Sequence, residues 1–316
     1  MEKKIAKELT RYQYVKTRNI DERMFIFNRI GIEKSKANVL ITGSSRIMQV
    51  GSQNLHKDVL NLSVSGASLE DIVTILDLGL AQFNPKQIII GCDPWLFNEL
   101  SGQKRWTSLE AHYVKAVKKL GVMPPIANPK ASNNYKMLMS IDYAVESMRY
   151  LASLNKDLGL NDGTPLDDVN LIKRDGSMIY NNVYANQSQF EIIESAKNWS
   201  KYSLNPYSYS PVLMDVFSRL IDYYRKDREI ILLLTPYHES TYQRLLKGNV
   251  DIVSIEKQFI SIAKEKGVTL VGSYNPKKTS CTPYEFFDGA HPKDSCMQKI
   301  VKELNVVGEI VVSGNL

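Results

Sequence analysis

The sequence predicts an α/β protein with a doubly wound parallel sheet. Three observations favour this class. Short apolar runs rich in β-branched residues stop at small or polar residues, amphipathic helical patterns separate these runs, and the alternation resumes after a long interruption. Hydrophobic residues make up 43% and charged residues 23% of the 316 residues, which is ordinary for a water-soluble globular protein.

Residues 1–36 predict a basic helical lead-in. One or two helices are expected over residues 3–30, where Ile5, Leu9 and Tyr12 begin a rough apolar stripe. Residues 1–36 carry ten Lys or Arg against five Asp or Glu, a net charge of +5. Their basic face is expected either to be solvated or to contact an anionic lipid surface or an anionic polymer.

Three predicted strands follow, and each ends in small or polar residues. They cover residues 38–42, 59–64 and 87–91. The pattern at Leu69–Phe83 predicts an amphipathic helix between the second and third strands, with Ser68 as its N-cap and Glu70 and Asp71 in its first turn. Strands that alternate with helices indicate parallel pairing.

The alternation is interrupted over residues 99–227, which predicts a long, mostly helical insertion. Helical patches are expected at residues 108–120, 135–153, 187–201 and 210–226. Lys173–Tyr180 contains an Asp-Gly turn and predicts a hairpin or a loop. Aromatic residues gather here among Asn, Gln and Ser, and they are expected either to stack on sugars or to pack half-buried at helix ends. They are Tyr180, Tyr184, Trp199, Tyr202, Tyr207 and Tyr209.

The alternating pattern returns after the insertion. It predicts a strand at 229–234, a helix around 251–266, a strand at 268–271 and a last helix from about Pro292 to Leu304. The five strands predict a flavodoxin-like sheet with the strand order 2-1-3-4-5. The resulting α/β domain spans residues 37–304, and residues 305–316 form a C-terminal tail.

Cysteine usage and terminal composition bear on the compartment. Cys92, Cys281 and Cys296 form no C-x-x-C pair, so buried or free thiols are expected rather than a disulfide scaffold or a zinc site. The N-terminus lacks the apolar core of a signal peptide, and no apolar stretch of about 18 residues occurs. A cytoplasmic location is expected for the chain as written, and a cell-envelope or periplasmic location if it belongs to a longer secreted or anchored protein.

The turn after the first strand carries a candidate nucleophile. The run Val39–Thr42 stops at Gly43-Ser44-Ser45-Arg46, and in parallel sheets ligands bind beyond the carboxyl ends of the strands. A serine in such a turn either acts as a nucleophile or caps the helix that follows.

A candidate partner for this serine lies near the C-terminus. In Asp288-Gly289-Ala290-His291, the three-residue spacing lets both side chains point to one side of a tight turn, so that the carboxylate orients the imidazole toward a nucleophile. Taken alone, the same spacing also suits a histidine that caps a helix or packs in the core.

Together these turns resemble the blocks of the SGNH, or GDSL-like, hydrolase superfamily. Gly43–Arg46 is similar to the first block, Ser63–Gly66 to the second, Gly91–Pro94 to the third and Asp288–His291 to the fifth. The similarity covers residues 38–98 and 228–304. A looser resemblance points to the branch that modifies bacterial surface polysaccharides.

The resemblance implies a triad of Ser45, His291 and Asp288. It also implies an oxyanion hole, to which the amides of Ser45 and Gly66 contribute together with the side chain of the third block. The family usually has Asn at that last position.

This chain has Asp93 instead, and an ionised carboxylate would repel the developing negative charge. A protonated Asp93, an Asp93 turned away to cap the next turn, or a compensating donor such as Asn98 or Arg46 would relieve the conflict.

The implied function is a serine esterase acting on O-acyl, most simply O-acetyl, groups of a carbohydrate or cell-surface polysaccharide. Arg46, Trp95 and His238 follow strands and are expected substrate contacts, and neither a cofactor, a metal nor nucleic acid is expected. One alternative is an O-acyltransferase with the same triad. Another is a catalytically inactive glycan-binding protein. A nucleotide-binding domain is disfavoured, because the chain has no G-x-G-x-x-G and no P-loop motif.

Overall fold

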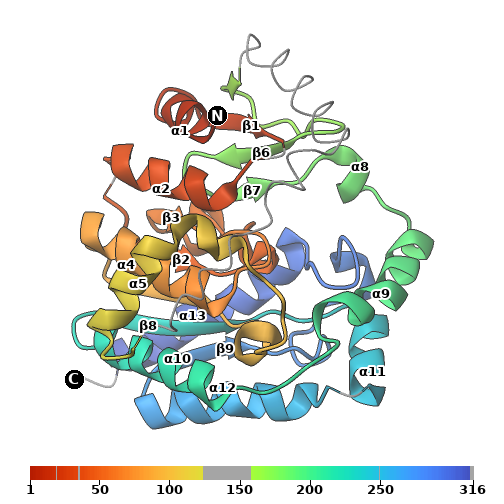
Figure 1. Cartoon of the computed structure of the whole chain (residues 1–316). Coiled ribbons are helices and arrows are strands. Elements are labelled where there is room, and N and C mark those ends of the chain that lie inside the picture. Colours follow the sequence, from red (N-terminus) through yellow and green to blue (C-terminus); the bar gives the residue numbers. More distant parts are fainter. Residues whose placement is uncertain (19, 35, 124–157, 249, 314–316) are drawn as a thin grey trace, which may run out of the picture.

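A parallel sheet of five strands forms the centre of the molecule (Figure 1). The computed structural model describes residues 1–18, 20–34, 36–123, 158–248 and 250–313. The strand order is β3-β2-β4-β8-β9, and every neighbouring pair is parallel. The strands are β2 (Val39–Thr42), β3 (Val59–Asn61), β4 (Gln87–Gly91), β8 (Glu229–Leu234) and β9 (Thr269–Gly272). The predicted α/β class with a parallel sheet is confirmed.

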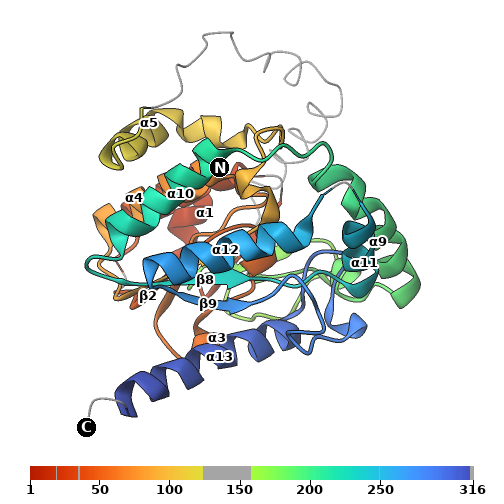
Figure 2. The same ribbon diagram turned by 90° about the horizontal axis from the view of Figure 1, so that it is seen from below.

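Helices cover both faces of this sheet because its central strands are apolar on both sides. Leu40 and Ile88 belong to one buried cluster, whereas Ile41 and Ile89, the next residue in each strand, belong to the other. In Figure 2, α4, α10 and α12 lie on one side of the strands, and α3 and α13 lie on the other. The helices are α3 (Ser52–Leu55), α4 (Leu69–Gln82), α5 (Glu110–Lys119), α10 (Pro211–Tyr224), α11 (Glu239–Lys247), α12 (Ile252–Lys266) and α13 (Asp294–Ser313).

Helix starts follow the expected capping chemistry. The Ser68 side chain accepts a hydrogen bond from the Asp71 amide, and the Asp71 carboxylate accepts one from the Ser68 amide, so α4 begins with the predicted cap. Helix α11, which the sequence analysis missed, begins after His238, whose Nδ1 accepts the Ser240 amide.

A second sheet joins the N-terminal segment to the insertion. It is antiparallel, with the order β5-β1-β6-β7. Its strands are β1 (Tyr14–Thr17), β5 (Gly159–Leu160), β6 (Asn170–Lys173) and β7 (Met178–Ile179), and α1 (Glu2–Leu9) and α2 (Glu22–Ile32) flank β1 in the chain. The expectation of helix throughout residues 3–30 is therefore wrong at β1. Val15 and Thr17 alternate inward there, and the partner strand β6 lies too far along the chain for a local pattern to indicate it.

Helices are the main regular secondary structure of the insertion where it is described. The predicted patches correspond to η3 (Arg105–Leu109) with α5, to α9 (Gln189–Ser203) and to α10, while the patch at 135–153 lies outside the described residues. A short helix, α8 (Asn182–Ala185), follows β7. The Asp-Gly turn forms a hairpin between β6 and β7, which is one of the two conformations expected from the sequence. Gly176 has φ +88, and a Cβ there would lie 2.0 Å from the Asn61 carbonyl oxygen, so this turn requires glycine.

Two C-terminal expectations need correction. Cys281 and Cys296 form a disulfide, which leaves Cys92 as a buried free thiol. The spacing of the cysteines gave no sign of this pair, because it forms only when the loop after β9, which contains η4 (Pro283–Glu285), folds back against α13. Helix α13 begins at Asp294 and continues to Ser313, so most of the expected tail is helical.

Part of the basic lead-in is internal. The guanidinium groups of Arg23 and Arg29 are buried, and Arg23 forms an ion pair with Asp71 at 2.8 Å. No helix in the described part of the chain combines the length and apolarity that a membrane span requires.

We expect reduction of the Cys281–Cys296 disulfide to lower the free energy of unfolding by about 3 kcal/mol, because closing a loop of this length restricts the unfolded chain. Urea unfolding with and without dithiothreitol measures the difference. A Cys281→Ala/Cys296→Ala variant should unfold at the same urea concentration in both buffers. Equal stability of the oxidised and reduced wild type would contradict this role.

Candidate active site

The candidate nucleophile lies directly after β2. Ser44 caps the short helix η1 (Ser45–Ile47) by accepting a hydrogen bond from the Arg46 amide at 3.2 Å. Ser45 is thereby left free to face His291, and its Oγ lies 2.9 Å from His291 Nε2. Ser44 therefore forms the cap considered for this turn, and the adjacent Ser45 is the serine that faces His291. Ser45 and His291 are half-buried, so the reacting atoms are not sealed inside the protein.

The carboxylate of Asp288 orients the imidazole of His291. Asp288 Oδ2 lies 2.8 Å from His291 Nδ1, and Oδ1 accepts the amides of Ala290 and His291 at 2.7 and 2.8 Å. Burial alone would raise the pKa of Asp288, but the charge and hydrogen bond of His291, the Ala290 amide and the Tyr184 hydroxyl hold this pKa well below its usual range. Asp288 is therefore ionised at neutral pH.

The structure brings the three predicted residues together as a continuous series, Ser45–His291–Asp288. The series crosses the edge formed by the carboxyl ends of the parallel strands. A hydroxyl next to an imidazole that is oriented by a carboxylate has the geometry for proton transfer during nucleophilic attack.

Two backbone amides in the turns after β2 and β3 have no hydrogen-bond acceptor among the described residues. Neither Ser45 nor Gly66 donates its amide hydrogen to any other described residue. The Val64 amide donates to the Gly43 carbonyl at 3.0 Å, which ties the segment after β3 to the nucleophile turn. Gly66 has φ +52, and a Cβ there would lie 2.5 Å from the Arg105 side chain, so the turn depends on glycine.

Residues outside the parallel sheet hold the Gly66 turn in place. From α2, Glu22 accepts hydrogen bonds from the amide and hydroxyl of Ser65, and Arg23 donates to the Ser65 carbonyl. From the insertion, Gln103 donates to the Gly66 carbonyl at 2.7 Å. The lead-in and the insertion therefore both contribute to this half of the site.

Asp93 is paired with Arg46 in the interior. Its carboxylate lies 3.1 Å from the Arg46 guanidinium, and the two residues are 3% and 1% exposed. Burial raises the pKa of Asp93, while the Arg46 charge acts in the opposite direction. Asp93 stands at the N-cap position of the short helix η2 (Pro94–Phe97), but its side chain makes no capping hydrogen bond. Its carboxylate supplies no donor to an oxyanion. Arg46 therefore neutralises the carboxylate charge that would otherwise repel an oxyanion.

Of the three expected substrate contacts, two are buried. Arg46 is enclosed by protein, and His238 is 2% exposed, with no described partner for its Nε2. Asn98 donates to the Pro206 carbonyl and accepts two amides, so its side chain holds a loop and is not a free donor. Trp95 is half-buried, its indole N–H donates to the Ala67 carbonyl, and its ring lies 6.1 Å from that of Trp199.

Two tyrosines of the insertion reach this site. The Tyr184 hydroxyl donates to Asp288 Oδ2 at 2.7 Å, and the Tyr180 hydroxyl donates to the Ser45 carbonyl at 3.0 Å. From the sequence, both residues are expected only as members of an aromatic group in the insertion. Their sequence context gave no sign of these contacts, because α8 meets the Asp288 loop only in the folded chain.

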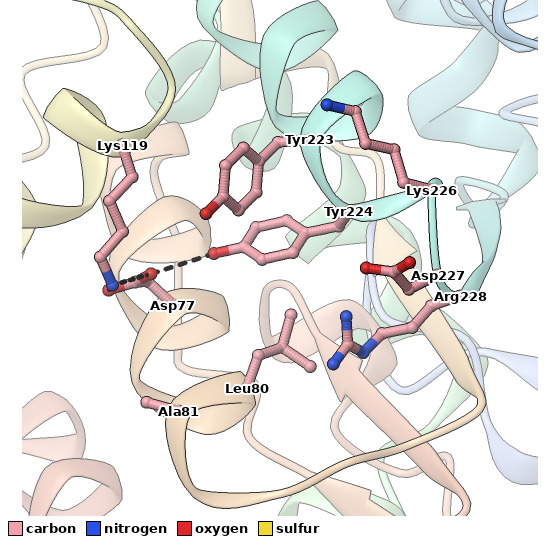
Figure 3. Close-up of a pocket in the computed structure, with 9 residues that line it drawn as sticks. All are labelled: Asp77, Leu80, Ala81, Lys119, Tyr223, Tyr224, Lys226, Asp227 and Arg228. Carbon is pink, nitrogen blue, oxygen red and sulfur yellow. Dashed lines mark hydrogen bonds and ion pairs between the residues drawn. The ribbon is translucent and has the colours of Figure 1, made fainter.

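A separate pocket lies at the opposite end of the sheet, where β8 begins (Figure 3). Its volume is about 410 Å³. The Asp77 carboxylate accepts hydrogen bonds from Lys119 and from the Tyr224 hydroxyl, and Lys226, Asp227 and Arg228 form one rim. None of the triad residues lines it.

Comparison with known proteins does not identify the chain. No protein-family model matches it, and a search of curated proteins finds no significant similarity.

We expect Arg46→Met to lower the free energy of unfolding by about 3–5 kcal/mol, because it leaves the buried Asp93 carboxylate without its counter-charge. Arg46→Met/Asp93→Asn should recover part of this loss. Arg219→Met, which removes the largely exposed ion pair with Asp215, serves as the control and should cost under about 1 kcal/mol. Urea unfolding measures all three. A loss at Arg46 no larger than at Arg219 would show that the buried pair does not stabilise the fold.

Proposed function

We propose that this protein is a serine esterase of the SGNH type that removes O-acyl, most simply O-acetyl, groups from a carbohydrate or cell-surface polysaccharide. The hydrogen-bonded series Ser45–His291–Asp288 carries the proposal. The membership itself and a flavodoxin-like sheet are part of the proposal. They are supported by the order of the sequence blocks and by the meeting of the first and fifth blocks at one edge of a parallel sheet.

The first half of the proposed reaction forms an acyl-enzyme. His291 Nε2 takes the proton of the Ser45 hydroxyl while the oxygen attacks the ester carbonyl, and the free amides of Ser45 and Gly66 would stabilise the oxyanion. The carbon–oxygen bond to the sugar then breaks, and His291 returns the proton to the leaving sugar oxygen. Asp288, ionised at neutral pH, stabilises the imidazolium that forms in between.

The second half releases the acyl group. Water attacks the acyl-serine, His291 takes its proton and returns it to Ser45, and a carboxylic acid leaves. A sugar hydroxyl in place of water would make the same protein an O-acyltransferase. The intact Ser45–His291 hydrogen bond and the neutralised Asp93 favour a working enzyme over an inactive glycan-binding protein.

Two further observations bear on substrate and compartment. Half-buried Trp95 and Trp199 are neighbours at the carboxyl end of β4, and tryptophan rings offer an apolar face with a polar edge, which suits a sugar ring. Disulfides persist mainly in oxidising compartments, so the Cys281–Cys296 pair supports a location in the cell envelope or outside the cell rather than in the cytoplasm. The exposed Lys3 and Lys7 of α1 would then be available to an anionic surface.

We expect a fluorophosphonate probe to label the wild type at Ser45, with loss of fluoride as the Ser45 oxygen binds phosphorus. Ser45→Ala should neither be labelled nor release acetate from an activated acetyl ester. Ser254→Ala, which changes a serine on α12, should behave as the wild type. Intact-mass analysis and an acetate assay measure the two effects.

The remaining outcomes separate the alternatives. Acetyl transfer to an added sugar, in place of acetate release, would indicate the transferase. A folded wild type that the probe does not modify would contradict the proposal and favour a binding protein.

A further inference from the structure

Tyr184 completes the hydrogen bonding of the Asp288 carboxylate. Asp288 Oδ1 is held by the amides of Ala290 and His291, which belong to its own turn. Oδ2 receives the Tyr184 hydroxyl at 2.7 Å and lies 2.8 Å from His291 Nδ1. The Tyr184 oxygen is itself 3.2 Å from Nδ1, so the hydroxyl lies against both members of the pair.

The Tyr184 side chain is firmly placed. Its ring stacks on Phe287, the residue before Asp288, with centroids 5.2 Å apart and planes inclined by 13°. Its amide donates to the side chain of Asn181, and the Asn181 amide donates to Asn170 on β6. Burial and the nearby Asp288 charge raise the pKa of Tyr184, so the hydroxyl keeps its proton and remains a donor at neutral pH.

We infer that Tyr184 is a positioning residue for the proposed acyl-transfer reaction: it fixes the second oxygen of Asp288 and thereby the orientation of the His291 ring. The inference rests on the proposed function. The amides of Ala290 and His291, which belong to the Asp288 turn, hold Oδ1. Among the described residues outside this turn, Tyr184 is the one whose side chain donates to Oδ2. His291 Nδ1 itself lies 3.0 Å from Oδ1 and 2.8 Å from Oδ2. Without the Tyr184 hydroxyl, the contact of Oδ2 with the imidazole would be the one left, so that the carboxylate and the ring could turn together and Nε2 would lose its alignment with Ser45.

Through Tyr184 and Tyr180, the insertion contributes side chains to the candidate active site. Tyr184 lies on α8, and β6, which anchors the start of α8, pairs with β1 of the lead-in. The Tyr180 hydroxyl, from the end of the same hairpin, donates to the Ser45 carbonyl. The docking of this segment therefore restrains the base and the nucleophile together.

We expect Tyr184→Phe to lower kcat for an activated acetyl ester by about 10- to 100-fold, the effect of losing one hydrogen bond to a charged group. KM should change little, because the hydroxyl contacts Asp288 and not the substrate. The rate of fluorophosphonate labelling at Ser45 should fall by a similar factor. The phenyl ring retains the stacking on Phe287, and thermal unfolding checks that the fold is intact.

Tyr224→Phe is the matched control. It also removes a tyrosine hydroxyl that donates to a carboxylate, that of Asp77 (Figure 3). This pair lines the separate pocket, which none of the triad residues lines. Its kcat and labelling rate should equal those of the wild type. In an Asp288→Asn background, Tyr184→Phe should have little further effect on kcat, because the two side chains act as one unit.

The outcomes are distinct. Wild-type labelling at Ser45 with an unchanged rate in Tyr184→Phe would overturn the inference and leave the proposed function standing. Equal losses in Tyr184→Phe and Tyr224→Phe, or full additivity with Asp288→Asn, would assign Tyr184 a general structural role and also overturn it. Absence of wild-type labelling would remove the proposed function and the inference with it.

Discussion

A buried guanidinium holds the segments of the candidate site together. Arg46 follows Ser45 directly, and its side chain contacts the segments after β4 and β8 and the Asp288–His291 turn. Its partners are the Asp93 carboxylate and the carbonyls of Thr235, Pro236 and Ala290, and the guanidinium also lies 3.9 Å from the centre of the Tyr237 ring. A charge this deeply buried is stable only when it is paired and fully hydrogen-bonded. The 2.9 Å approach of Ser45 to His291 therefore depends on a residue that touches neither reacting atom.

This arrangement also explains the aspartate at position 93. In the family that we propose for this chain, an amide side chain at this place donates to the oxyanion. Here the side chain serves Arg46 instead, and an uncharged amide would leave the guanidinium without a counter-charge. The oxyanion site that we propose is then left with backbone amides as its donors. These amides carry no net charge, so they need no counter-charge. Arg46 and Asp93 form one structural unit. A substitution at either position leaves the other residue with a buried, unpaired charge.

Sequence patterns indicated those elements whose formation depends on residues close together in the chain. The apolar runs at Val39–Thr42 and Glu229–Leu234 become buried strands, and Ser68 caps α4, because periodicity and capping act within a few residues. The position of Ser45 beside His291 also agrees with what parallel strands imply about their carboxyl ends. Local patterns did not indicate three other features. These are the strand β1, the Cys281–Cys296 bond and the contact of Tyr184 with Asp288. Each joins segments whose meeting depends on the whole fold, and β1 alone resembles part of a helical stripe.

These contacts show which segments position the candidate site and which segments orient its side chains. The parallel sheet sets the positions of Ser45 and of the Asp288–His291 turn, but it supplies few of the side chains that orient them. Glu22 of the lead-in holds the Gly66 turn, and Tyr184 of the insertion holds Asp288. Because β1 pairs with β6, the segments that carry these two residues share one antiparallel sheet. The Gly66 turn and the Asp288–His291 turn are therefore linked to each other through the antiparallel sheet. A displacement of this sheet would disturb both turns at once.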